Sequence, residues 1–263
     1  MVKYKKIPLS IGILSWRRPS LLRANLSLIK DAKIDLYTDL FVIAQQANNS
    51  HEEICRYYNI PLKPFKDNLG IAGGIKRVFE QSKNENVLHL EEDIIISRNP
   101  QEVLNTIETA YTALTTKKAD VCFLRDLENP GNNFDMTKYQ KMWKVGETNL
   151  CPTLKGKIRP SKAKKTKGLG LYDPLLSQDK KDIIFKKSPL GYQLSSKNLN
   201  WTNQAFMTSK KFMFETILPY VYEKPTTRLV NGYPDIERSL NSRWWRKKNF
   251  KLLHTNGCFT HIG

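Results

Sequence analysis

The chain has 263 residues, of which 40% are hydrophobic, so it can bury one sizeable core. No apolar run approaches the ~20 residues that a membrane-spanning helix needs, which argues against an integral membrane protein. The formal charge of +18 favours polyanionic or phosphate-bearing partners, and it is also compatible with peripheral contact to an anionic membrane surface.

The first half of the chain alternates strands with helices. Apolar and β-branched runs predict five strands, at residues 7–15, 40–44, 60–65, 87–90 and 121–124. Helical spacing of apolar residues predicts four helices, at residues 19–29, 51–58, 70–82 and 101–115. This alternation is typical of an α/β fold with a mainly parallel sheet and helices on both faces.

The second half is less regular. Residues 129–196 are rich in Gly, Pro, Asn and Lys, so we expect long loops with short strands over an active-site face. Within them, residues 155–167 include seven basic residues and no acid, and we expect a mobile loop there. Further patterns predict two helices and a strand, at residues 210–222, 235–247 and 250–254.

Three acidic residues, Glu91, Glu92 and Asp93, directly follow the predicted strand at 87–90. Ligands of an open α/β sheet lie beyond the carboxyl ends of its strands, so these carboxylates fall at the binding edge. Mg²⁺ and Mn²⁺ bind carboxylate oxygens and leave positions for substrate phosphates. The pattern predicts a metal or acid/base site, and its plain alternative is a charged surface turn.

A glycine-bearing turn precedes the helix predicted at 70–82. Asn68, Gly70 and Gly73 lie around the start of this helix, where backbone N–H groups and the helix dipole favour an anion. Lys76 and Arg77 add positive charge for a diphosphate. The alternative is an ordinary glycine turn followed by a basic helix face.

A basic turn follows the first predicted strand. Ser15, Arg17 and Arg18 lie there, at the same edge of the sheet as the acids. Arginine can pair bidentately with phosphate or stack on a base, so this turn is a candidate nucleotide contact. The alternative is a basic turn that only leads into a helix.

The last candidates lie near the end of the chain. Asp235 and Glu237 begin a predicted helix, where acids commonly complement the helix dipole. Either could act as a general base if burial or a second acid raised its pKa. His261 is by itself a structural hydrogen-bonding residue, and it becomes a metal-ligand candidate if the chain returns it to the acidic edge.

Together these segments resemble a GT-A glycosyltransferase and are similar to the inverting enzymes of family 2. The turn at residues 15–19 resembles the family's T-Y-N-R-P-like turn beside the nucleotide, and residues 68–77 resemble its N-x-G-x-x-x-A-R-N helix beside the uracil and diphosphate. Glu91 and Asp93 match the outer positions of the D-x-D motif, with Asp93 in the metal-binding one.

The late residues extend the resemblance. Asp235 and Glu237 stand where the family places its E-D base, and His261 resembles the histidine that completes the metal shell in many GT-A enzymes. The sequence departs from the family in having glutamate first in D-x-D, D-x-E as the base motif, and no Q-x-x-R-W motif of processive members. The resemblance therefore implies a non-processive enzyme that adds single sugars.

The resemblance implies one GT-A domain over residues 1–263, with a nucleotide-sugar-binding half at 1–127 and a loop-rich acceptor-binding half at 128–263. The domain can equally be a module of a longer protein. The implied reaction is metal-dependent inverting transfer, with Mn²⁺ or Mg²⁺, of a hexosyl or deoxyhexosyl group from a UDP-sugar to a hydroxyl of a glycan or other acceptor. Asp235 is the first choice of base and Glu237 the second.

Other sequence features bear on compartment and on rival functions. The four cysteines form no C-x-x-C pair, which fits the reducing cytoplasm of a bacterial or virus-infected cell. A nucleic-acid-binding protein would explain the charge and the Trp244–Lys248 cluster, but three adjacent acids would repel its phosphates. A sugar-nucleotide pyrophosphorylase would need glycine in the first turn, and a catalytically inactive carbohydrate-binding relative remains a further alternative.

Overall fold

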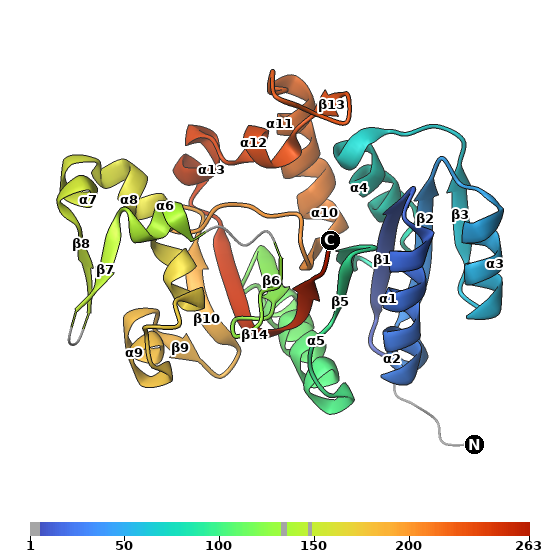
Figure 1. The fold of residues 1–263 in the computed structure, drawn as a ribbon, viewed down its shortest axis with the longest axis horizontal. Helices are drawn as coiled ribbons and strands as arrows, with labels where there is room; N and C mark the ends of the chain where they lie inside the picture. Colours follow the sequence, from blue (N-terminus) through green and yellow to red (C-terminus); the bar gives the residue numbers. More distant parts are fainter. Residues whose placement is uncertain (1–5, 133–135, 147–148) are drawn as a thin grey trace.

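The computed structural model describes residues 6–132, 136–146 and 149–263. They fold around a 10-stranded sheet in the order β3-β2-β1-β4-β11-β6-β14-β10-β9, with β5 paired to β14 (Figure 1). Parallel pairing joins β3, β2, β1 and β4, and also β6 and β14, whereas β11 runs antiparallel between β4 and β6. Strands from both halves of the chain therefore make up one mostly parallel α/β sheet.

The strands and helices predicted for the first half are confirmed, with small shifts at their ends. The strands are β1 (Leu9–Trp16), β2 (Asp39–Gln45), β3 (Leu62–Phe65), β4 (Asn86–Glu91) and β6 (Val121–Arg125). The helices are α1 (Pro19–Asp31), α3 (Asn49–Tyr57), α4 (Gly70–Gln81) and α5 (Pro100–Thr115), with a short α2 (Ile34–Tyr37) between the first two. Asn48 and Asn99 form capping boxes that set where α3 and α5 begin.

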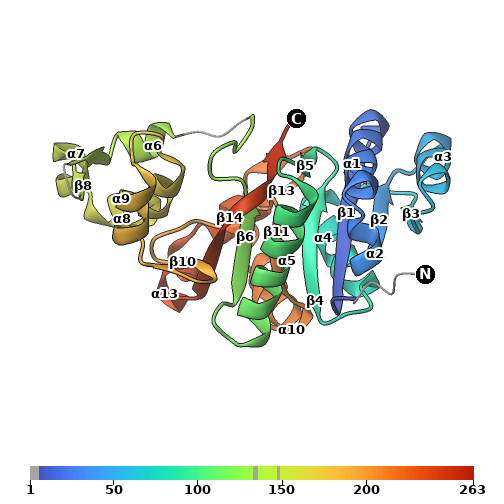
Figure 2. The same cartoon turned by 90° about the horizontal axis from the view of Figure 1, so that it is seen from below.

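The sheet is buried on both faces, as Figure 2 shows for α1 and α5 on one side. Leu88 and Leu90 of β4 pack in the cluster with α1 and α5, while Val87 packs in the opposite cluster with α4. This explains the continuous apolar run, because a strand covered on both faces has no solvent side. His89 is fully buried 5.0 Å from the Phe206 ring, and burial lowers its pKa to about 3, so it packs as a neutral aromatic residue.

The region predicted to be loops is instead a lobe of short helices and strands. The short strands were expected, but the helices were not, and the prediction of a mobile loop at 155–167 is wrong. Thr153 caps the first helix of this segment and Pro160 begins the second, and lysine is a good helix former. The elements are α6 (Thr137–Gln140), β7 (Trp143–Val145), β8 (Leu150–Pro152), α7 (Leu154–Ile158), α8 (Pro160–Thr166), η1 (Lys167–Tyr172), α9 (Gln178–Ile184), β9 (Lys187–Ser188) and β10 (Gly191–Ser195).

The last third contains the predicted helices in modified form. The helix predicted at 210–222 is a continuous run whose centre is π-helical, and the helix predicted at 235–247 is two helices. Asn241 separates these two, because its side chain bonds the backbone N and O of Trp201. The elements are β11 (Phe206–Ser209), α10 (Lys210–Phe212), η2 (Met213–Ile217), α11 (Leu218–Glu223), β12 (Leu229–Val230), β13 (Tyr233–Pro234), α12 (Ile236–Leu240) and α13 (Arg243–Lys248).

The final strand, β14 (Lys251–His261), is longer than predicted and extends to the edge of the sheet at which β4 ends. An irregularity between His254 and Phe259 shifts its register against β6. Gly257 makes this passage possible, since it has φ +82° and its Cα lies where any Cβ would strike the carbonyl of Arg125. In the described part of the chain, no helix combines the length and the apolar character needed to cross a bilayer.

Candidate active site

Two strands, β4 and β14, end at an acidic corner formed by Glu91, Glu92 and Asp93, and a third, β5, begins there. β4 ends at Glu91, and the chain turns through the other two residues into β5 (Ile94–Ile96). The antiparallel pairing of β5 with β14 sets His261 opposite Ile94, and the backbone N–H of residue 262 donates to the Asp93 carbonyl at 2.9 Å. The last strand thus brings His261 back to the acids. This is the arrangement under which the sequence makes His261 a candidate metal ligand.

Asp93 is almost fully buried, and its two carboxylate oxygens have different surroundings. Oδ2 accepts a hydrogen bond from Arg18 Nη1 at 2.7 Å and lies 3.3 Å from His261 Nε2. Oδ1 is buried without a hydrogen-bond partner in the described structure. Burial tends to raise the pKa of this carboxyl, but the bonds and charges of His261 and Arg18 outweigh it and hold the pKa below its usual value. Asp93 is therefore an ionised carboxylate with one oxygen free to take a ligand.

Glu92 is bound to the turn that follows β1. Its Oε1 accepts from Arg18 Nε at 2.8 Å and from the Trp16 backbone N–H at 3.4 Å, and the residue is 3% exposed. One guanidinium therefore bridges Glu92 and Asp93. Arg18 lies at the edge where a diphosphate was expected, but in this structure its Nε and Nη1 are used by the acids.

Glu91 and Glu237 are two further carboxyl groups near the corner, and neither forms an ion pair among the described residues. The pKa of Glu91 is raised well above the usual value, first by burial and then by the charges of Asp93, Glu92 and Glu237. The Glu237 carboxylate accepts from the Asn203 backbone N–H at 2.9 Å, and burial raises its pKa as well. The fold thus brings Glu237 of α12 close enough for its charge to raise the pKa of Glu91 on β4.

Asp235 has a different environment from Glu237. It is the N-cap of α12, where its side chain accepts from the Arg238 backbone N–H at 3.1 Å. It also forms an ion pair with Arg228 at 3.4 Å. With these two partners, the Asp235 carboxylate has a structural role in capping α12 and binding Arg228. Of the two candidates for the base, Glu237 is the one that lies in the field of the acidic corner.

A cavity of about 100 Å³ adjoins the corner on the side of α4. Gln45 shapes it, because its side chain accepts from the Leu69 N–H at 2.6 Å and donates to the Gly70 carbonyl at 3.4 Å. Asn68 Oδ1 accepts from the Gly70 N–H at 2.9 Å. The lining residues are Leu14, Trp16, Arg18, Gln45, Asn68, Gly70, Ile71, Glu91, Glu92, Val230 and Asn231.

The hairpin of β12 and β13 covers the start of α4. The Tyr233 hydroxyl donates to the Asn68 carbonyl, and a Cβ on Gly70 would lie 2.5 Å from the Tyr233 side chain. Gly70 also has φ +67°, so both its backbone conformation and the covering ring require glycine. The two turn residues, Asn231 and Gly232, have φ of 50° and 85°, which is the type I′ pattern of two-residue hairpins.

Several predicted contacts lie outside this cavity. Lys76 and Arg77 both form ion pairs with Glu80 along the surface of α4. Arg17 is exposed, with its Cζ 4.9 Å from the centre of the Trp16 ring. Two further candidates are enclosed by the protein: Ser15 is fully buried, and Gly73 packs against Leu69.

Sequence reasoning missed several residues that shape the site: Gln45, Arg125, Asn203 and the hairpin at 229–234. The Asn-Gly dipeptide at 231–232 is a strong hairpin signal and was the clue available for that element. Arg125 is buried at the end of β6, and its guanidinium donates to the Pro130 and Asn132 carbonyls. No local pattern marks Arg125 or Asn203, because their positions depend on long-range packing.

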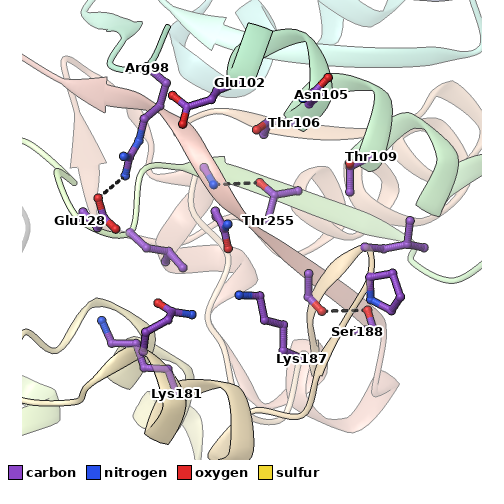
Figure 3. A pocket seen from close by; sticks show the side chains of 17 residues that line it. Arg98, Glu102, Asn105, Thr106, Thr109, Glu128, Lys181, Lys187, Ser188 and Thr255 are labelled. Atoms are coloured by element: carbon purple, nitrogen blue, oxygen red, sulfur yellow. Dashed lines mark hydrogen bonds and ion pairs between the residues drawn. The ribbon is translucent and has the colours of Figure 1, made fainter.

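A larger cavity, of about 510 Å³, lies elsewhere, between α5, β14 and the α9–β10 region (Figure 3). Its charged rim is largely paired internally: Arg98 binds Glu128 at 2.7 Å, and Lys187 lies 3.3 Å from Asp182. It contains none of the carboxylates of the acidic corner. The cavity beside α4, although smaller, is therefore the one that adjoins the candidate chemistry.

The acidic corner fits a hard divalent cation that keeps ligands from outside the protein. Among the described residues, no three Asp, Glu, His or Cys side chains converge into a complete metal site. Mg²⁺ and Mn²⁺ are commonly held by one or two carboxylates together with substrate phosphates and water. Asp93 Oδ1 is a buried anionic oxygen without a partner, and Glu91 adds a second carboxylate beside it.

Comparison with known proteins defines the fold class. The sequence matches no protein-family model and no curated protein. Among solved structures, it is similar to S. aureus TarS, with 12% identity and a TM-score of 0.50, over 98% of this chain and 37% of TarS. A structure of TarS 1–349 also has 12% identity and a TM-score of 0.50, over 97% of this chain and 60% of that one.

A third solved structure is the mannosyltransferase PcManGT of Pyrobaculum calidifontis in complex with GDP-Man and Mn²⁺. It has 9% identity and a TM-score of 0.53, over 99% of this chain and 57% of that one. The chain thus spans between 37% and 60% of the length of these three structures. At such identities the likeness shows the fold alone. The chain has a GT-A glycosyltransferase fold, as the sequence resemblance implied.

Proposed function

We propose that this chain is a glycosyltransferase that moves a single sugar from a nucleoside-diphosphate donor to a hydroxyl of a glycan or other acceptor. The observation that carries the proposal is the pair of carboxylates Glu91 and Asp93 at the end of β4, beside the Gly70 cavity, with Glu237 of α12 near enough for its charge to raise the Glu91 pKa. A GT-A fold with carboxylates at this edge is suited to bind a metal–diphosphate on one side and an acceptor hydroxyl on the other. The division into a donor half at 1–127 and an acceptor half at 128–263 belongs to the same proposal.

The donor occupies the α4 side of the corner in this proposal. The start of α4, where the helix dipole points outward and Gly70 adds no side chain, favours an anion there. A cavity of about 100 Å³ is smaller than the ~300 Å³ or more of typical ligand sites. Entry of a nucleotide sugar therefore requires the hairpin at 229–234 to move away from Gly70. UDP is the expected carrier from the family resemblance, and GDP-Man in PcManGT makes guanosine donors the natural comparison.

Asp93 and Glu91 would hold Mn²⁺ or Mg²⁺, with His261 beside them. When bound, the cation would neutralise the negative charge that develops on the leaving diphosphate. Arg18 keeps Asp93 ionised and oriented, because its guanidinium fixes the other oxygen at 2.7 Å. These roles follow from the orphaned Asp93 Oδ1 and from the charge around it.

Glu237 is the proposed general base. Its carboxylate is oriented by the Asn203 N–H and its pKa is raised by burial, so it is a stronger base than a solvent-exposed glutamate. Removal of the hydroxyl proton as the acceptor attacks in one step would invert the anomeric centre. Asp235, the first choice from the sequence, would instead support Glu237 by capping the helix that carries it.

The test is a panel of UDP- and GDP-sugars with Mn²⁺, read as thermal shift and nucleotide release. We expect one donor class to stabilise the protein and EDTA to abolish the shift. A complete lack of stabilisation by every nucleotide sugar would contradict the proposal. The protein would instead be a carbohydrate-binding relative if a donor stabilised it without any release of nucleotide and if Glu237→Gln showed the same thermal shift.

The four cysteines are free, which fits work in a reducing cytoplasm.

A further inference from the structure

Five basic residues from four helices gather around Lys165, near enough for the other four charges to act on it. They are Lys138 of α6, Lys162 and Lys165 of α8, Arg238 of α12 and Arg246 of α13, and we call them the basic cluster. Burial lowers the pKa of Lys165, and the positive charges of the other four lower it further. Among the described residues, no member of the cluster forms an ion pair. The fold therefore concentrates positive charge here without neutralising it.

Buried hydrogen bonds fix this arrangement. In η1, which directly continues α8, the Gly168 N–H donates to the Asn198 carbonyl at 2.9 Å. On α13, Trp245 Nε1 donates to the Leu199 carbonyl at 2.9 Å, and its carbonyl accepts from Ser196 Oγ at 2.6 Å. Both helices are thus attached to the segment at 196–199, as their neighbouring positions in Figure 1 illustrate. The cluster results from the backbone fold rather than from the chance reach of flexible lysines.

One member of the basic cluster, Arg238, directly follows Glu237, the proposed base, in the sequence. Glu237 turns inward to the Asn203 N–H, whereas Arg238, its neighbour on α12, is exposed. The donor cavity lies against a different set of elements, β1, α4 and the hairpin. None of the five basic residues lines that cavity. The positive charge is therefore placed to act on the acceptor and not on the donor diphosphate.

We propose that the acceptor is a chain that carries repeated negative charges, such as a phosphate-bearing glycan, and that the basic cluster binds it. This inference rests on the proposed function and names its acceptor class. Like charges held close together destabilise a fold, and a bound polyanion relieves their repulsion while releasing its own counterions. Such a surface would hold an acidic chain while one of its hydroxyls reaches Glu237.

The aromatic residues argue against nucleic acid as the occupant. Single-stranded nucleic acid needs free aromatic faces beside the positive charge on which bases can stack. Trp244 is already stacked on Tyr220, with ring centroids 3.9 Å apart and planes 5° apart. Trp201 and Trp245 are fully buried in the core. The indoles that suggested base stacking in the sequence are thus used by the fold itself.

The position of the charges also favours a chain over a bilayer. Lys165 and Arg246 are partly buried between helices, so the centre of the cluster is set back from the surface. A flat membrane would reach exposed side chains more readily than these two. The exposed Leu154 and Ile158 of α7, at 76% and 70%, nevertheless make anionic vesicles a necessary arm of the test.

The experiment measures binding of long-chain inorganic polyphosphate to the full chain, without donor, over a range of salt concentrations around ~0.15 M. The variant Lys162→Glu/Lys165→Glu removes the centre of the cluster. The variant Lys117→Glu/Lys118→Glu is the matched control, since it has the same net charge and its exposed lysines lie between α5 and β6. Thermal melts of all three proteins establish that each is folded.

We expect the wild type and the control to bind polyphosphate with affinity that falls as salt rises. The cluster variant should bind at least ~10-fold more weakly, with a log–log salt slope smaller by about 2. Equal losses in the two variants, or no binding by the wild type, would overturn the inference. Tighter binding of a single-stranded oligonucleotide, or of phosphatidylglycerol vesicles, that is lost in the cluster variant would also overturn it in favour of that partner. Donor-induced thermal shifts are measured separately, so their failure counts against the proposed function alone.

Discussion

The acidic corner and the basic cluster carry opposite charges and are built in different ways. At the corner, short side chains lie at fixed distances on strand ends, and Arg18 and His261 neutralise part of the charge on Asp93. In the cluster, long side chains from four helices gather without any ion pair among the described residues. The corner is thus suited to a ligand that needs defined geometry, and the cluster to one that needs only sustained attraction.

The largest expected effect distinguishes the two acids of α12. Glu237→Gln should lower the turnover number by ~10²–10⁴, because it removes the proposed base while keeping size and hydrogen bonding. Asp235→Ala should instead lower stability by about 0.5–2 kcal/mol, because it removes the N-cap. Initial rates of nucleotide release and thermal melts separate these outcomes. An active Glu237→Gln enzyme would return the role of base to Asp235.

The next effect concerns the ionised carboxylate of the corner. Asp93→Asn should lower turnover by ~10²–10³, the usual result of losing one preorganised charged group at a reacting centre. It should also abolish the thermal shift on adding Mn²⁺ with donor. Asp39→Asn is the matched control, because Asp39 lies at the opposite end of β2 and binds Ser10 and Lys83. Equal metal responses in both variants would place the metal elsewhere.

A smaller effect compares two glycines with positive φ. Gly232→Ala meets no atom within 4 Å, so it should cost only the left-handed strain of about 1–2 kcal/mol. Gly70→Ala has the same strain and also strikes Tyr233, so it should destabilise the protein more and raise the KM for donor. Denaturant titration and donor saturation curves measure both. If the two variants behave alike, the hairpin does not cover Gly70 in solution.

The smallest effect is on stability as a function of pH. A carboxyl whose pKa is higher in the folded state contributes stability that is present at low pH and lost as pH rises through its folded pKa. Glu91 and Glu237 are of this kind, so the Tm should rise as pH falls through their folded pKa values towards the ordinary pKa of glutamate. Asp93, whose pKa is lowered, acts in the opposite sense at more acidic pH.

Glu91→Gln isolates that effect. Removing the charge should raise the Tm at neutral pH by roughly 2–4 °C, the shift that about 1 kcal/mol produces in a chain of this size. It should also flatten the dependence of Tm on pH below the folded pKa of Glu91, where protonation of the wild-type side chain adds stability. A lower Tm in this variant would show that the Glu91 charge is compensated in the free protein. In that case the negative charge of the acidic corner would be neutralised within the protein. The corner would then differ even more from the basic cluster, whose positive charge has no ion-pair partner among the described residues.

The sequence indicated much of the first half and of the acidic corner. Local periodicity was sufficient for β1, β2 and β4 and for α1, α4 and α5, because each buries a continuous or regularly spaced apolar set. The three acids after β4 were visible because they interrupt such a run. Periodicity failed for α7 and α8, since helices this short each bury only one or two residues and their lysines resemble those of a loop.

By itself, the sequence determined the order of strands and helices in the first half of the chain and the carboxylates at the end of β4, since both depend on neighbouring residues. Only the tertiary structure decided which of these carboxylates is paired and which is not. Arg18 and Asp93 lie 75 residues apart, and Asn203 and Glu237 lie 34 apart, so no local pattern announces their contacts. Burial and distance between remote segments set the pKa of each acid, and those quantities exist only once the chain has folded.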